Sequence, residues 1–528
     1  MSSISYELDK SGIAILRFDN PHGLANKLSR DDLSWLGEFL NNIDGQLDMI
    51  ENENEIRAVI LYSEKANSFI SGSDLREYLS FTLADEGRAY SLKAQEITER
   101  IESSRAPFIA AVNGPCLGMG LEIALSCEYR IGSENPATVF GMTGVLAGLI
   151  PCAGGTQRLP RLIGTKEALE LIISGDTLNS ENSLEIGLID EIVPDEILLE
   201  ISLERALDIS NKEFKPRRSH FKGIQHTIVN ENPIARKKLF NDLRKRVKKD
   251  VRPLINAPIM AIEALEVGMS SFNRGLHVES VYFGELVVST SSRSLIRTQM
   301  ALEIVQEDPK STNKDKFINK ISVHGANDLG NQIACLAASA GITTRIKAQD
   351  DEGVGNGLKH CYDYFTNEYD NHLIDELRFE HKFDLISAAS DYSGIKRADI
   401  VIDCTDEDLQ LKLDSIKEIE PLLKDDAVYL SSSIVFPIAG IASNSTRPEK
   451  VIGARIFEHR DSELIEISVM EETSIAALAR VLEFSDRLGK TPIVVKGGTG
   501  SYTTRLELAY FNESLNLASE GLAIEDIE

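Results

Sequence analysis

A glycine-rich turn followed by one glutamate is the first feature of the sequence that indicates chemistry. Gly118 and Gly120 flank Met119. An apolar segment at 107–112 precedes them, and Glu122 follows. Glycines between a strand and a helix let backbone N–H groups approach a ligand closely, and the helix start adds positive potential. Such a turn can hold an oxyanion while the carboxylate moves protons, although the same residues also fit an ordinary helix start.

Two further segments narrow this choice, because they accompany the turn in a fixed order. The three segments are NSFISGSDLREY (67–78), APFIAAVNGPCLGMGLEIALSCEYRI (106–131) and GLIPCAGGTQRLPRLIG (148–164). Together they resemble the enoyl-CoA hydratase/isomerase (crotonase) family. The resemblance implies an acyl-CoA thioester whose carbonyl oxygen lies between two backbone N–H groups, those of Ser73 and Met119. It also implies that Glu122 is one of two glutamates that move protons.

The second glutamate is missing. The resemblance places it in FGMTGVLAGLIP (140–151), where this chain has Thr143 and Gly144. Addition of water to a double bond needs a base to activate the water and an acid to protonate the α-carbon. A single carboxylate suits double-bond isomerisation, decarboxylation or thioester hydrolysis better. The residues therefore predict the substrate class more firmly than the reaction.

A second glycine turn begins near Gly325, within the segment KISVHGANDLGNQIACLAASAGITTRIKAQ (320–349). The pattern predicts strand, turn, helix and strand, which is the context that a dinucleotide fingerprint requires. Gly325 and Gly330 occupy two of the three glycine positions, but Asn327 occupies the middle one, where a side chain would crowd a pyrophosphate. Asparagine tolerates a left-handed backbone better than most residues, so we expect the turn to persist.

This second half resembles the 3-hydroxyacyl-CoA dehydrogenase domain of the multifunctional fatty-acid oxidation alpha subunits, in which it follows a crotonase domain. The resemblance covers almost the whole chain, with FGEL (283–286) among its supporting segments. It implies NAD as cofactor and an acidic residue at the end of the second strand. Ala348 occupies that position here, and Asp350 is the nearest substitute.

The catalytic positions of the dehydrogenases differ here as well. Where the resemblance implies Ser, His, Glu and Asn, this chain has Ile434, Arg455, Glu466 and Thr504. Arginine stays protonated and cannot accept the proton of a hydroxyl group. We therefore predict that the dehydrogenase half is inactive, that NAD binding through Gly325 and Gly330 is doubtful, and that an Arg455–Glu466 ion pair replaces the His–Glu pair.

The predicted fold class is α/β, with a crotonase-like spiral domain, a helical connector, a Rossmann-like doubly wound domain and part of a helical subdomain. The expected boundaries are 1–210, 211–312, 313–496 and 497–528. A polar segment, DPKSTNKDK (308–316), marks the start of the second half. The resemblance implies a longer chain, so the last part looks like a truncated subdomain.

The elements that must position these residues are predicted by local patterns. Short apolar or alternating runs predict strands. They lie at 4–8, 12–18, 56–62 and 107–112. Ser29 and Asp32 have the spacing of a capping box, which predicts a helix start. Between 212 and 306 the strand signal disappears, and prolines divide a helical pattern.

Composition excludes several classes of function. The 528 residues include 56 Lys and Arg against 83 Asp and Glu, a net charge of −27 that disfavours nucleic acid and anionic membranes. The six cysteines are scattered, which predicts reduced thiols and no metal site. No apolar stretch reaches the length of a membrane span and the start lacks a signal peptide, so we expect a cytoplasmic protein. A basic run at 236–252 fits either an anion-binding strip or a solvated helix face.

Two hypotheses follow from the sequence. The first is an acyl-CoA-processing enzyme that uses Glu122, Ser73 and Met119 and needs no cofactor in its first domain. The second is a non-catalytic acyl-CoA-binding or assembly subunit, with a thiolase subunit or a second copy of the chain as possible partners.

Overall fold

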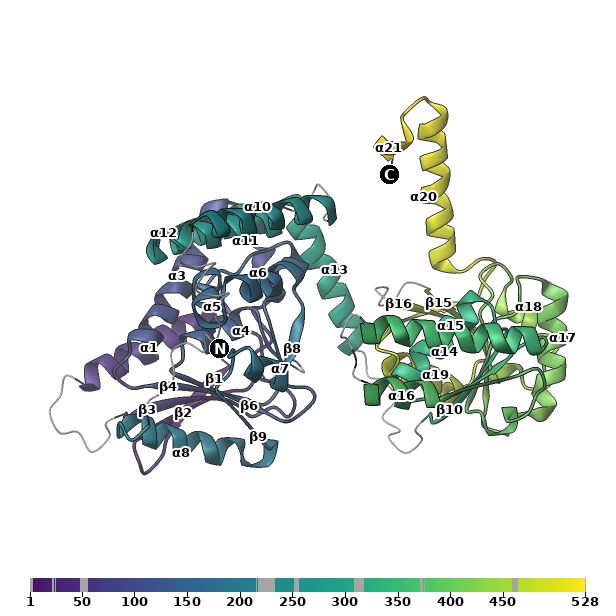
Figure 1. The fold of residues 1–528 in the computed structure, drawn as a ribbon, viewed down its shortest axis with the longest axis horizontal. Coiled ribbons are helices and arrows are strands. Elements are labelled where there is room, and N and C mark those ends of the chain that lie inside the picture. Colours follow the sequence, from purple (N-terminus) through teal and green to yellow (C-terminus); the bar gives the residue numbers. More distant parts are fainter. Residues whose placement is uncertain are drawn as a thin grey trace. The chain divides into compact units, whose positions relative to one another are not determined.

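The computed structural model forms two compact units, Met1–Ala301 and Leu302–Glu528 (Figure 1). The described residues are 3–20, 23, 25–47, 56–214, 216, 233–250, 256–307, 318–370, 374, 376–457 and 464–527. The predicted boundary at 308–316 lies outside them.

The first unit is built on a six-stranded sheet of order β1-β2-β3-β4-β6-β9, parallel except for the β1–β2 pair. Its strands are β1 Ile4–Leu8, β2 Ile13–Phe18, β3 Ala58–Ser63, β4 Phe108–Val112, β6 Tyr129–Ser133 and β9 Glu191–Val193. Alternate residues of these strands face two cores. One core, with Ile60 and Ile109, lies under α8 (Leu198–Ser210), and the other, with Val59 and Leu61, lies under the remaining helices (Figure 1).

The remaining elements of the first unit surround the second face of this sheet. A small sheet consists of β5 Cys116–Leu117, β7 Val139–Gly141 and β8 Thr177–Asn179. The helices are α1 Arg30–Leu47, α2 Leu75–Tyr78, α3 Ala84–Ser103, α4 Met119–Ser126, α5 Gly155–Ile163, α6 Thr165–Ser174, α7 Ser180–Glu185, α10 Pro233–Asp250, α11 Ala257–Gly268, α12 Phe272–Val287 and α13 Thr290–Glu307.

The helices expected to form a separate connector share the core of the first unit. Phe283 and Leu265 belong to the same buried cluster as Leu61. Gly87 of α3 and Gly284 of α12 let the two helices cross closely. A Cβ on Gly284 would lie 2.4 Å from the carbonyl oxygen of Ala84. This contact explains why a glycine follows phenylalanine in the FGEL segment. The four-part division stays a prediction, while contacts group the chain into two units.

The second unit contains an eight-stranded sheet of order β12-β11-β10-β13-β14-β15-β16-β17, parallel except between β15 and β16. Its strands are β10 Lys320–His324, β11 Thr343–Lys347, β12 Ile386–Ala389, β13 Ile400–Asp403, β14 Val428–Ser431, β15 Val451–Ile456, β16 Leu464–Val469 and β17 Thr491–Lys496. Its helices are α14 Asp328–Ser339, α15 Asp351–Asp370, α16 Glu376–Asp384, α17 Leu409–Ile419, α18 Ile438–Ala442, α19 Ile475–Arg487, α20 Tyr502–Ser519 and α21 Ile524–Ile527. The order reverses at β10, which places the ligand crevice of such sheets beside the Gly325 turn.

Several local predictions are confirmed. All four predicted strands form, as β1 to β4. At the start of α1, Ser29 N donates to Asp32 Oδ2 at 2.9 Å and Asp32 N donates to Ser29 Oγ at 3.1 Å, which is the reciprocal pair of a capping box. Pro233 is the first residue of α10 and Pro258 the second of α11, where the N–H that proline lacks would have no partner within the helix.

Other sequence features have structural counterparts too. All six cysteines are buried and free. The basic run lies largely on α10, where Arg244 pairs with Glu266 and Phe240 is buried. Within the described ranges, no helix is long and apolar enough to cross a membrane.

Candidate functional site

Two segments that carry the predicted oxyanion donors lie side by side in the first unit. Leu117 N donates to Ile70 O at 3.0 Å, which aligns the segment before Met119 with the one before Ser73. Each donor follows a glycine with positive φ, 93° at Gly72 and 50° at Gly118. The backbone N–H groups of Ser73 and Met119 have no acceptor within the described part of the chain. Two adjacent donors are therefore available to a ligand.

The side chains of the two donor residues also touch. Ser73 Oγ lies 3.6 Å from Met119 Sδ, and Tyr90 OH lies 3.4 Å from Ser73 Oγ. Phe283 stacks on Tyr90 with ring centroids 6.1 Å apart. The FGEL segment on α12 thus supports the residue that holds Ser73 in place.

Glu122 lies one turn beyond Met119 on α4, so both occupy the same face of the helix. Its side chain is only 2% exposed. Oε1 accepts N–H groups from Ala153 and Gly155, both at 2.7 Å, and Oε2 accepts that of Cys152 at 3.2 Å. Burial and the charge of Glu279 raise the pKa of Glu122 to about 8, against these hydrogen bonds.

Glu279 is a buried carboxylate that the sequence analysis missed. It comes from α12, and its oxygens accept Gly154 N at 2.6 Å and Thr156 N at 3.0 Å. Thr156 Oγ1 and Gln95 Nε2 donate to it as well. Burial raises its pKa, against the hydrogen bonds that favour its charged form. Nothing in the local sequence marks Glu279, because its partners are more than a hundred residues away.

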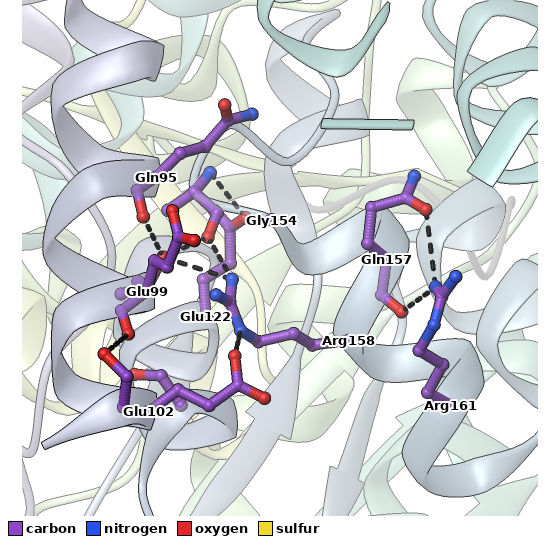
Figure 2. A network of polar contacts seen from close by, with 12 residues as sticks. Gln95, Glu99, Glu102, Glu122, Gly154, Gln157, Arg158 and Arg161 are labelled. Atoms are coloured by element: carbon purple, nitrogen blue, oxygen red, sulfur yellow. Dashed lines mark hydrogen bonds and ion pairs between the residues drawn. The ribbon is translucent and has the colours of Figure 1, made fainter. Parts of the chain in front are cut away.

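The loop before α5 joins these two carboxylates. Its five successive amides, 152 to 156, are divided between Glu122 and Glu279. Gly155 permits the close approach, since a Cβ there would lie 2.8 Å from Glu122 Oε1. Arg158 holds the loop through Ala153 O at 2.9 Å and pairs with Glu102 of α3 at 2.9 Å (Figure 2). The segment 148–164 therefore acts as a frame for Glu122.

The two positions matched to the segment of the missing second glutamate, Thr143 and Gly144, carry no carboxylate. Thr143 begins a short 3₁₀ helix, Thr143–Ala147. Its Oγ1 lies 3.9 Å from the point where a Cβ on Gly118 would be. Thr143 thus lies beside the oxyanion turn, but its hydroxyl group cannot serve as a base at neutral pH, and Gly144 has no side chain.

In the second unit, the side chain of Asn327 caps the turn before α14. Gly325 has φ 117° and α14 follows, so the expected turn is present, with Asn327 in an extended rather than a left-handed backbone at φ −85°. Asn327 Oδ1 accepts Gly330 N at 3.0 Å, and its Nδ2 donates to Cys404 O at 2.6 Å. A pyrophosphate would need the amides of this helix start. The residues present do not leave the Gly330 amide free for it.

Other polar groups lie along the carboxyl edge of this sheet. Ala348, at the expected ribose position, is buried, and Asp350 accepts Gly353 N at 2.8 Å as part of the start of α15. Behind the crevice, Lys412 and Asp403 are both fully buried, with Nζ and Oδ2 3.6 Å apart. Ala348 supplies no acceptor for a ribose hydroxyl group.

The four positions matched to dehydrogenase catalysis gather around the start of α20. Arg455 Nη1 donates to Thr504 Oγ1 at 2.7 Å, and Ser501 N donates to the carbonyl oxygen of Ile434 at 3.0 Å. The predicted Arg455–Glu466 ion pair is wrong. Arg455 pairs with Glu507 at 2.7 Å, and Glu466 accepts the Tyr502 and Thr503 amides, because α20 supplies closer partners to both.

Two family models match the two halves of the chain. Residues 9–247 match the family model of enoyl-CoA hydratase/isomerase, and residues 320–498 match that of the 3-hydroxyacyl-CoA dehydrogenase NAD-binding domain. Among solved structures, FadB2 of M. tuberculosis aligns at 23% identity and TM-score 0.39, over 40% of this chain and 75% of that one. The (S)-3-hydroxybutyryl-CoA dehydrogenase PaaH1 of Ralstonia eutropha aligns at 26% and 0.38, over 39% and 74%.

A crotonase-like domain followed by a Rossmann-like NAD-binding domain defines the class of this protein. The fatty acid oxidation complex subunit alpha of Shewanella loihica is 33% identical over 523 residues, which span 98% of this chain and 72% of that protein. That of Shewanella amazonensis is 32% identical over 521 residues, with the same coverage. The chain therefore belongs to the family of fatty acid oxidation complex alpha subunits. The predicted family and fold class are confirmed.

Proposed function

We propose that the first unit moves a proton along the acyl chain of an enoyl-CoA thioester. The Ser73 and Met119 amides hold the thioester oxygen, and Glu122 is the acid and base. The observation that carries this proposal is that the adjacent N–H groups of Ser73 and Met119 have no acceptor among the described residues, and that Met119 lies one turn before the buried Glu122 on α4. Such donors stabilise the enolate oxygen that forms when the α-carbon loses a proton.

A single available carboxylate favours isomerisation over hydration. Glu122 removes a proton from the α-carbon of a 3-enoyl thioester and returns it to the γ-carbon, so the double bond moves into conjugation and no water is consumed. Glu279 accepts hydrogen bonds from four donors, and the Thr143–Gly144 pair carries no basic group. Neither supports the activation of water that a hydratase requires.

The second unit, in this proposal, does not oxidise 3-hydroxyacyl-CoA and binds NAD weakly. Asn327 occupies the helix-start amide that a pyrophosphate needs, and Arg455 stands where a neutral base is required. The fully charged guanidinium cannot take the hydroxyl proton that must leave when a hydride departs. No step of the proposed reaction uses a cofactor.

One observation favours a second candidate, an acyl-CoA-binding or assembly subunit that works beside a thiolase. Both oxygens of Glu122 already accept loop amides, and the side chain is buried. A carboxylate held in this way can be structural.

Absorbance of the conjugated thioester separates the candidates. The protein is mixed with 3-enoyl-CoA and with 2-enoyl-CoA, and Glu122→Gln is compared with Glu96→Gln, an exposed glutamate on α3. We expect conversion of 3-enoyl-CoA that falls at least ~100-fold in Glu122→Gln only, because a proton-transfer group contributes about 10² to 10⁴. Loss of 2-enoyl-CoA absorbance would identify a hydratase, and no change in either assay would favour the binding role. NADH formation from 3-hydroxyacyl-CoA would contradict the inactive second unit.

A further inference from the structure

A pocket lies at the amino-terminal edge of the second unit's sheet, where no sequence motif pointed. Its volume is ≈ 350 Å³. It is lined by the first residues of β10 and β11, by Ser387 of β12 and by the segment 393–398. Parallel strands start at one edge and end at the other, so this pocket lies at the edge opposite the Gly325 turn. It is therefore separate from the dinucleotide crevice.

The lining of this pocket is basic and rich in hydroxyl groups. Lys320, Arg345 and Arg397 contribute to it, and three hydroxyl residues lie among them. The hydroxyl residues are Thr343, Ser387 and Ser393. The chain has a net charge of −27, whereas the residues that line this cavity carry three positive charges and no negative one. Field lines from such a cluster attract anions into the cavity.

Arg345 is the central cation and has unused hydrogen-bonding capacity. Its Nη2 donates to Ser393 Oγ at 2.7 Å, which fixes the guanidinium against the loop. Its Nε is buried and has no acceptor among the described residues, although the charge of Arg345 contributes to the lowered pKa of the nearby Asp391. A buried N–H without a partner is uncommon, so an acceptor from a ligand is the missing element.

The nearby carboxylates are engaged by other groups. Asp399 accepts the backbone N–H groups of Asn319 and Lys320, both at 2.9 Å, and pairs with Lys424. Asp391 accepts Ser393 N at 3.0 Å. These contacts order the loop and the strand start without supplying the acceptor for Arg345 Nε.

We propose that this pocket binds the phosphate group of a small phosphorylated molecule. The planar guanidinium matches the geometry of phosphate oxygens, and neighbouring hydroxyl groups donate to the remaining ones. The volume is at the lower end of the range for small-ligand sites, which fits a compact anion. The proposal does not depend on the reaction assigned to the first unit.

Calorimetric titration of the full chain with inorganic pyrophosphate tests this site. We expect saturable binding that weakens at least tenfold in Arg345→Met and severalfold in Arg397→Gln. Lys347→Met is the matched control, because Lys347 ends the strand that carries Arg345, near the opposite edge of the sheet. It should change the affinity less than twofold, and an excess of NAD should not compete.

The same titration can overturn the proposal. It fails if pyrophosphate does not saturate, if Lys347→Met abolishes binding while Arg345→Met does not, or if NAD displaces the probe. Tighter binding of citrate than of pyrophosphate would overturn the choice of phosphate. Circular dichroism establishes that Arg345→Met is folded, and the exposed Arg397 provides a variant that leaves the buried structure untouched.

Discussion

Two glycine turns, each between a strand and a helix, show how similar local sequences give different sites. At the start of α4, Gly118 turns the chain and the Met119 amide has no acceptor within the described residues. At the start of α14, the side chain of Asn327 turns back and takes the Gly330 amide. A helix start therefore serves a ligand only where the chain does not cap it itself.

The start of α5 is a third case, in which distant side chains cap the helix. Glu122 and Glu279 accept its amides between them, so the charge of Glu279 acts on Glu122. The hydrogen bonds hold Glu122 in place, while burial and repulsion make its charged form harder to keep. The contacts that position Glu122 thus favour its charged form, while burial and the charge of Glu279 raise its pKa.

The largest expected effect on activity comes from a substitution at Gly118, in the turn before α4. Gly118 has φ 50° and ψ −119°, a conformation that L residues avoid, so Gly118→Ala must rotate the Met119 amide. Removal of one oxyanion donor lowers kcat by about 10² to 10³. We expect a loss of that order in the isomerisation assay. Gly489→Ala is the control for backbone strain, since Gly489 also has a positive φ, 68°, and open space around it. If Gly118→Ala kept activity within threefold of the wild type, the Met119 amide in the first turn would not be an oxyanion donor.

Local features of this site could be predicted from the sequence, whereas long-range partners could not. The strands, the Ser29–Asp32 capping box and the Gly118 turn depend on residues within a few positions of each other. Glu279 meets Glu122 through the packing of α12, which no local pattern encodes. The predicted partner of Arg455 was wrong for the same reason, because the placement of α20 decides which carboxylate it reaches.

A tenfold change in NADH affinity is expected when the Asn327 side chain is removed from the turn before α14. Asn327→Gly removes the side chain that occupies the Gly330 amide, so NADH should bind about tenfold tighter, which corresponds to about 1.4 kcal/mol. The change from an asparagine cap to glycine costs only a few tenths of a kcal/mol in stability. Fluorescence titration with NADH measures the affinity.

Asn327→Asp is the matched variant for this turn. It keeps a capping oxygen but adds a negative charge, so NADH should bind no better than to the wild type. Turnover of 3-hydroxyacyl-CoA should stay absent in both variants, because Arg455 still lacks a free electron pair for the proton. Unchanged NADH affinity in Asn327→Gly would mean that the self-cap is not what limits binding.

The smallest effect, a shift along the pH axis, tests the link between the two buried carboxylates. Glu122 must be ionised to remove the α-proton, and its pKa of about 8 predicts that kcat/KM rises with pH up to about 8 and then levels off. Glu279 and the Cys152 thiol are the titratable groups against it. Glu279→Gln removes a negative charge beside Glu122, which favours ionisation of Glu122. The plateau should therefore begin at a lower pH. The ratio of kcat/KM at pH 7 to its plateau value should be a few-fold higher in Glu279→Gln than in the wild type.

Glu263→Gln separates this effect from a general disturbance of the connector helices. Glu263 lies on α11 and accepts Tyr282 OH at 2.8 Å, away from the loop before α5. It should leave the profile unchanged. If Glu279→Gln lowered activity equally at every pH, Glu279 would only support the loop, because a structural loss reduces the population of competent enzyme without moving its pKa. A shift to lower pH requires that the charge of Glu279 acts on Glu122 in the working enzyme. That outcome would show that Glu279 helps to set the pKa of the catalytic carboxylate and does more than hold the loop before α5.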